Sequence, residues 1–182
     1  MPVLAQIIAQ FPFVVAGFHS DNGSETINSK VAKLLEKLRI EQTKSRSRQS
    51  NDNALAESKN ASVVRNHRGH DHIPQKYARP INAFYQEIFN PWLNLHRPCL
   101  FATSIENAKG KIVKRYKHED VKTPLDCLAL LNAQGLVTFR EDITLAALQS
   151  QASAQTDLAA AQAMQQAKRE LFATFIKPQR RA

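Results

Sequence analysis

Two carboxylates, Asp21 and Glu57, have the residue type and the spacing of metal-binding catalytic groups. Asp21 follows the apolar run 12–18, which is typical of a strand buried on both faces, and Glu57 lies in an expected helix, with 35 residues between the two acids. A strand end and a packed helix can hold carboxylate oxygens around two divalent ions that promote phosphoryl transfer. Magnesium suits such an all-oxygen site. On spacing alone, two unrelated surface acids remain the alternative.

The helix around Glu57 supports the metal-site hypothesis. In an α-helix, Ala54, Glu57, Ala61 and Val64 fall on one side, so we expect the carboxylate to lie in a stripe of small or apolar residues facing the sheet. A charge in that position is costly unless it is paired or bound to a metal ion.

A formal net charge of +9 and an isoelectric point near 9.8 favour a polyanionic partner, with nucleic acid preferred over an anionic membrane. Basic residues gather in the loop that leads to Glu57, along its helix, and in a later hairpin. A basic surface that binds nothing is the alternative. The residues proposed to contact DNA are Lys44, Arg46, Arg48, Lys59, Arg65, Arg68, Lys111, Lys114 and Arg115.

Hydrophobic periodicity, caps and turn residues predict alternating helices and strands over most of the chain. The turn after the first strand is expected to begin at His19. The helices are predicted over 3–10, 28–38, from 51 or 53 to 67, 80–96 with a bend at Pro91, 124–131 and 144–176. The strands are predicted over 12–18, 39–44, 100–104 and 111–116, and the last two are expected to form a hairpin.

Other residue types exclude several kinds of site. The only cysteines, Cys99 and Cys127, are too few and too far apart in sequence for a disulfide framework or a four-thiolate zinc site. No apolar run approaches the roughly 20 residues that a membrane helix needs. The histidines at 67, 70 and 72 are expected in a polar loop, and the aromatic residues of 80–96 in a core. His19 either orients a metal-bound water or phosphate, or simply ends the strand.

The sequence segments around the two carboxylates resemble motifs of a known protein family. The segments His19-Ser-Asp-Asn-Gly-Ser-Glu25 and Lys44-Ser-Arg-Ser-Arg-Gln-Ser-Asn-Asp-Asn-Ala-Leu-Ala-Glu57-Ser-Lys-Asn60 resemble the second and third acidic motifs of insertion-sequence DDE transposases and retroviral-type integrases. The likeness continues through Asn94-Leu-His-Arg-Pro98, Arg115-Tyr116 and Thr123-Pro124 to about residue 175.

This resemblance implies an α/β chain with a truncated ribonuclease H-like (integrase core) fold and a helical C-terminal extension. The implied regions are a partial catalytic core over 1–98, a basic β-hairpin over 99–123 and a helical region over 124–182. Asp21 and Glu57 would be catalytic metal ligands for Mg²⁺ or Mn²⁺, and the process would be DNA transposition and integration. The implied partners are transposon ends and target DNA, together with a second copy of the chain or a full-length transposase, in the bacterial cytoplasm at the nucleoid.

The chain also departs from this family, whose members use a third carboxylate on an earlier strand. Residues 1–20 contain neither Asp nor Glu, so we expect a truncated copy without strand-transfer activity. Two alternatives stay open: a small DNA-binding or regulatory protein derived from a transposase, and a non-specific nuclease that works with two carboxylates.

Overall fold

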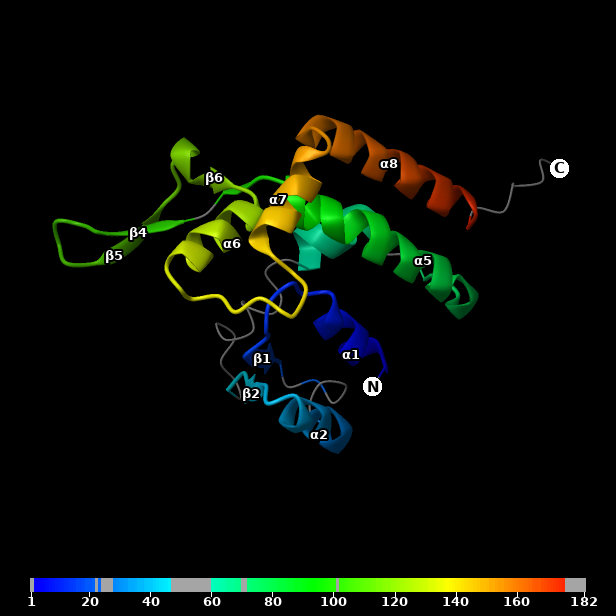
Figure 1. Cartoon of the computed structure of the whole chain (residues 1–182), viewed down its shortest axis with the longest axis horizontal. Helices are drawn as coiled ribbons and strands as arrows, with labels where there is room; N and C mark the ends of the chain where they lie inside the picture. The colour runs from blue at the N-terminus through cyan, green and yellow to red at the C-terminus, as the bar shows by residue number, and fades with distance from the viewer. Residues whose placement is uncertain are drawn as a thin grey trace. The chain divides into compact units, whose positions relative to one another are not determined.

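The structure is a computed structural model that describes residues 2–21, 23, 28–46, 60–69, 72–100 and 102–175. The chain divides into two compact units, Met1–His72 and Ile73–Ala182 (Figure 1). The sequence instead suggested a division after residue 98. The segment 73–98 belongs to the second unit because its helical turns pack against α8 (Asp157–Ala173).

The first unit is built on a β–α–β arrangement. Strands β1 (Gly17–Ser20) and β2 (Glu41–Lys44) are parallel, with Gly17 opposite Glu41 and Ser20 opposite Lys44. Helix α2 (Ser29–Lys37) connects them, and α1 (Pro2–Ala9) precedes β1. The turns η1 (Asn60–Arg65) and α4 (Asn66–Arg68) follow.

Helix α2 confirms the predicted amphipathic helix. The Asn28 side chain accepts hydrogen bonds from the amides of Lys30 and Val31, as a helix N-cap does. Val31 and Leu35 are buried and form the core of the unit with Ile40, against which Leu4, Ile8, Val15 and Phe18 pack.

The first strand differs from its prediction. It begins at Gly17 rather than Pro12, it includes His19 and Ser20, and Val14 in the preceding segment is 56% exposed. The partner strand sets this start, because the chain reverses at Arg39, which has a φ of 55°, and β2 begins only at Glu41. The bonding to β2 therefore reaches back only to the Ala16 carbonyl, which accepts from the Glu41 amide at 2.9 Å, and residues 12–15 lie before it.

The second unit contains most of the helices. Its first part, η2 (Gln75–Tyr77), α5 (Ala78–Phe84), η3 (Tyr85–Phe89) and η4 (Trp92–His96), occupies the helix predicted over 80–96, with π-type turns on both sides of Pro91. Phe84 and Phe89 are buried, and the rings of Phe89 and Trp92 lie 5.5 Å apart. The expectation of an aromatic core is confirmed.

Three later helices complete this unit, and the sequence predicted two of them as one. Helix α6 (Pro124–Ala133) begins with Thr123 and Asp126 capping each other. The helix predicted over 144–176 is instead α7 (Leu145–Ser153) and α8. The break occurs because Thr156 caps a new helix, its hydroxyl accepting from the amide of Ala159. Helix α8 buries Ala160 and Met164.

The strands of this unit form two antiparallel pairs. Strand β3 (Cys99–Leu100) pairs with β6 (Val121–Lys122), which follows the turn η5 (His118–Asp120). Strands β4 (Thr103–Glu106) and β5 (Ile112–Arg115) form the predicted hairpin, but its first strand begins three residues late because Leu100 pairs with Val121 instead. All three sheets of the described residues are two-stranded, and a ribonuclease H-like fold stays a prediction.

Candidate functional site

Asp21 lies directly after the last residue of β1. Its side chain is half-buried, and one carboxylate oxygen accepts a hydrogen bond of 3.1 Å from the amide of Gly23. Because β1 and β2 are parallel, their carboxyl ends meet at one edge of the pair, where Ser45 donates its amide to the Ser20 carbonyl at 2.9 Å. In α/β structures ligands commonly bind outside such strand ends.

A cluster of three polar side chains joins the two strands beside Asp21. His19 Nδ1 lies 2.9 Å from Thr43 Oγ1, and His19 Nε2 lies 3.4 Å from Ser45 Oγ. Ser45 is only 1% exposed. A serine next to a histidine suggests a nucleophile, but this hydroxyl is closed to a substrate and also lies 3.4 Å from the Ser20 carbonyl oxygen. The cluster therefore fastens the strand ends together.

Sequence reasoning proposed two roles for His19 and did not single out Thr43 or Ser45. His19 is a residue of β1, and its two ring nitrogens lie near hydroxyl groups of Thr43 in β2 and of Ser45 just after β2, so its side chain links the two strands. The partners are 24 and 26 residues away, and only the strand register brings them together. No local signal in the sequence indicates this register.

The implied divalent metal site is only partly represented in the described residues. Glu57 lies outside them, and no group of three or more His, Cys, Asp or Glu side chains forms a metal site in the part that is described. Next to Asp21, the hydroxyl of Ser20 is 4% exposed and has no hydrogen-bond partner among these residues. One carboxylate and one hydroxyl are oxygen ligands that suit magnesium, but they do not hold two ions.

Two basic residues, Lys44 and Arg46, lie at the end of β2, the strand that pairs with β1. Lys44 ends β2 opposite Ser20, and both cationic side chains are exposed. Arg48 and Lys59, which sequence analysis added to this surface, lie outside the described residues. The described part of the edge thus combines a carboxylate with two nearby cations, an arrangement that suits a phosphate-bearing ligand with a metal ion.

Arg65 and Arg68 are exposed near the end of the following helical segment. The prediction that Val64 lies in an apolar stripe facing the sheet is wrong, because Val64 is 37% exposed. Its neighbour Val63 is half-buried instead. The reason is the π-type geometry of η1, because a turn with i to i+5 bonds shifts the buried face relative to an α-helix. Glu57 keeps its predicted role without support from this stripe.

The remaining DNA-contact candidates, Lys111, Lys114 and Arg115, are exposed on the β4–β5 hairpin of the second unit. Near the base of the hairpin, Lys117 pairs with Glu119 at 2.9 Å, and this hydrogen bond raises the pKa of Lys117 above its usual value. Asp120 accepts from the Thr103 hydroxyl at 2.7 Å, which lowers the pKa of the Asp120 carboxyl.

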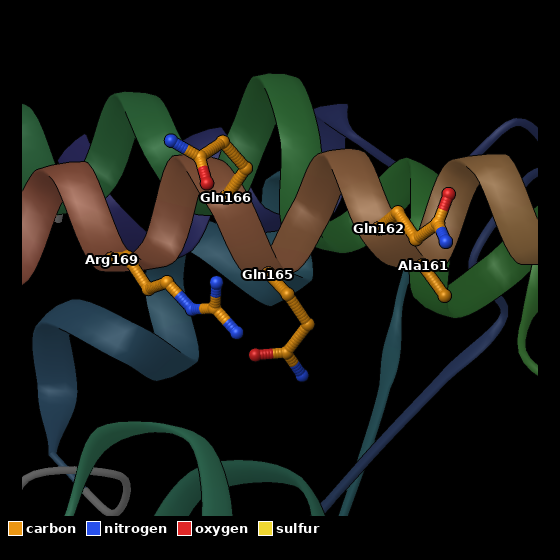
Figure 2. A pocket seen from close by; sticks show the side chains of 5 residues that line it. All are labelled: Ala161, Gln162, Gln165, Gln166 and Arg169. Atoms are coloured by element: carbon orange, nitrogen blue, oxygen red, sulfur yellow. The ribbon is translucent and has the colours of Figure 1, made fainter.

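The remaining hollow, thiols and histidines of the described residues form no metal site. A shallow hollow is lined by side chains of α8 alone, and it contains amides and one guanidinium but no acid (Figure 2). These residues are Ala161, Gln162, Gln165, Gln166 and Arg169.

Cys99 and Cys127 are free thiols. His67 and His72 belong to no metal-ligand group in the described structure, and His70 lies outside the described residues.

No helix in the described part of the chain has the length and apolarity needed to cross a membrane. No family model matches the chain, and no solved structure matches it significantly. The chain is similar to "Uncharacterized protein y4rM" from Sinorhizobium fredii (strain NBRC 101917 / NGR234), with 28% identity over 113 residues, which is 62% of this chain and 32% of that protein. The matched region thus spans about a third of the relative's length.

Proposed function

We propose that this chain carries the second catalytic aspartate and the catalytic glutamate of a DDE-type transposase, Asp21 and Glu57, and that by itself it binds DNA without cutting it. The observation that carries the proposal is the place of Asp21. It stands one residue beyond β1 in a β–α–β unit with parallel strands, beside the strand end that bears Lys44.

The physical support is the combination of charges at this edge. Lys44 and Arg46 attract the phosphates of DNA, and a carboxylate that approaches a phosphate needs a cation between them to offset repulsion. A divalent ion, Mg²⁺ or Mn²⁺, supplies that charge when bound and polarises a phosphodiester. Asp21 would be one of its ligands. Glu57, with 35 residues between it and Asp21, is the second carboxylate of the proposal.

The chain's own composition limits this activity. The family mechanism implied by the resemblance uses three carboxylates, and residues 1–20 supply none. Two carboxylates leave the ions short of charged ligands, so we propose binding rather than strand transfer for the 182 residues taken alone.

The experiment measures DNA affinity by fluorescence anisotropy with and without Mg²⁺. We expect Mg²⁺ to strengthen binding by the parent chain and to have little effect on Asp21→Asn. The matched control is Glu41→Gln, which removes an exposed carboxylate at the opposite end of the same strand pair. A magnesium effect that survives Asp21→Asn, or that disappears equally in Glu41→Gln, contradicts a metal site at Asp21.

A second candidate is a small DNA-binding or regulatory protein derived from a transposase. The exposed basic hairpin favours it, because that hairpin lies in the second unit and does not depend on Asp21. Capture of a full-length transposase by the purified chain supports this candidate. Binding that depends on magnesium and Asp21 favours the first.

A further inference from the structure

The hairpin formed by β4 and β5 is a two-stranded ribbon with little covering it. All four residues of β4 and three of the four in β5 are exposed; the exception is Val113, which is half-buried. In Figure 1 the hairpin extends away from α6 and α8 of its own unit. An unsupported two-stranded ribbon contributes little core to a fold, which indicates that its surface serves a partner.

The tip of this ribbon is ordered by its own hydrogen bonds. Asn107 Oδ1 accepts from the amides of Lys109 and Lys111, each at 3.0 Å, and Gly110 donates its amide to the Asn107 carbonyl at 2.9 Å. Gly110 has a φ of 72°, a conformation that favours glycine. The side chains at the tip are therefore presented from a preorganised turn, which lowers the entropy cost of binding.

The register separates the side chains into two faces. One face holds Thr103 and Arg115, which are directly opposite each other. It is tied to its own unit, because Thr103 bonds to Asp120 and Val113 is half-buried on the same side. The other face holds Ser104 opposite Lys114 and Glu106 opposite Ile112, and all four are exposed.

The positive charge of the ribbon lies at its tip and along β5. Lys117 and Lys122 pair with Glu119 and Asp120 at the base. By contrast, no ion pair is found within the described residues for the cations of the tip and β5. These cations are Lys109, Lys111, Lys114 and Arg115. The acid on the ribbon itself is Glu106, close to Gly110 at the tip.

We propose that the β4–β5 hairpin binds duplex DNA by entering the major groove with its Ser104–Lys114 face toward the base edges. The groove is about 12 Å wide and admits a two-stranded ribbon, whose strands lie about 4.8 Å apart. Lys114 and Ser104 donate to acceptors on the bases, and Glu106 accepts from cytosine amino groups. Lys109 and Lys111, at the tip, contact the phosphates beside the groove.

The test compares a 25-base-pair DNA duplex, the same sequence as duplex RNA, and single-stranded DNA, with the full chain in each case. We expect the DNA duplex to bind most tightly, because the major groove of duplex RNA is too deep and narrow for a ribbon. Methyl green, which occupies the major groove, should displace the protein, whereas netropsin, which occupies the minor groove, should not. Duplex RNA that binds equally well, or displacement by netropsin alone, overturns the proposal.

A variant with Lys109, Lys111 and Lys114 changed to Ala tests the residues. We expect at least about tenfold weaker binding and a log–log salt slope lower by about two to three. The matched control changes Lys30, Lys33 and Lys37 on α2, all exposed, and removes the same charge. Equal loss in the two variants means that net charge alone acts, and overturns the groove assignment.

This inference rests on the proposed function only in sharing DNA as the partner, and the two fail differently. If the hairpin variant binds as the parent does while the magnesium effect still needs Asp21, the groove proposal is wrong and the proposed function stands. If the hairpin binds duplex DNA but magnesium has no effect, the proposed function is wrong and the ribbon is a DNA-binding element in its own right.

Discussion

The Nδ1 atom of His19 lies 2.9 Å from the hydroxyl oxygen of Thr43, across the parallel pair β1–β2. This contact holds together the two strand ends that flank Asp21. Asp21 follows His19 by two residues, so any opening of the strand pair moves the carboxylate relative to Lys44.

Loss of the Thr43 hydroxyl should loosen this edge. For Thr43→Val we expect the free energy of local opening to fall by about 1 kcal/mol or less, because the contact is exposed and exchanges with water. Hydrogen exchange of the peptide that spans β2, followed by mass spectrometry, measures this change. Thr43→Ser keeps the hydroxyl and should restore protection. Equal exchange in the Val and Ser variants contradicts a bonding role.

The 182-residue chain should show no strand transfer with Mg²⁺ or Mn²⁺ on transposon-end or plasmid DNA. The reason is that the proposed DDE-type mechanism needs three carboxylates, and none precedes Asp21 in this sequence. Gel analysis of labelled DNA detects joined products. Their appearance, with loss in Glu57→Gln, would falsify this expectation and show that two carboxylates are enough.

In the second unit, the ring of His96 is 3% exposed and its Nδ1 lies 3.0 Å from Asp157 at the start of α8. Asp157→Ala leaves a buried ring nitrogen without this partner. We expect a loss of about 1–3 kcal/mol in the free energy of unfolding, followed by the fluorescence of Trp92 in urea.

The matched variant is Asp157→Asn, which retains an oxygen acceptor but loses the charge. It should be less destabilising than Asp157→Ala if the hydrogen bond to His96 matters. Both variants lose the same favourable charge at the helix N-terminus, so that effect cancels in the comparison. Equal destabilisation would assign the effect to charge rather than to the His96 contact.

The Cys127 thiol should react slowly with iodoacetamide. Burial raises its pKa above the usual value, and the thiolate is the reactive form, so a smaller fraction reacts at a given pH. In a Cys99→Ser background, the rate should reach its midpoint at a higher pH in the folded chain than in urea. A folded midpoint at or below the unfolded one contradicts a pKa raised by partial burial of the thiol.

Local patterns were enough to predict some elements and not others. Helix α2 follows from its 3.6-residue periodicity and from Asn28, whose capping contacts reach only two and three residues ahead. The start of β1 was mispredicted because pairing with Glu41, not apolarity, decides it. The π-type turn η1 was missed because no residue signal in the sequence distinguishes its i to i+5 bonds from those of an α-helix.

Some parts of the candidate site could likewise be predicted from local sequence patterns, and others could not. Asp21 was predictable because a polar turn follows an apolar run, although the strand continues through Ser20 before that turn. The contacts of His19 with Thr43 and Ser45 were not, because they join residues brought together only by strand register. Glu57 lies outside the described residues, so its pairing with Asp21 stays a prediction.

The final prediction concerns association through the first unit. In the described residues its sheet has only two strands, and a two-stranded parallel sheet has little stability by itself. Ile7 and Val14 in the same unit are 48% and 56% exposed, and a two-stranded sheet leaves edges that can pair with another chain. We therefore expect concentration-dependent oligomers or aggregates, measured by size-exclusion chromatography with light scattering.

A paired substitution identifies the surface responsible. Ile7→Lys with Val14→Lys should shift the chain toward a monomer, because charges oppose both apolar contact and edge pairing. The control, Leu136→Lys with Leu158→Lys, adds the same charge at apolar residues that are 70% and 69% exposed in the second unit. If the control disperses the chain equally, general charge repulsion is the cause. A parent chain that is already a monodisperse monomer with one sharp melting transition would instead show that the first unit needs no further strand, and would favour a small independent DNA-binding protein.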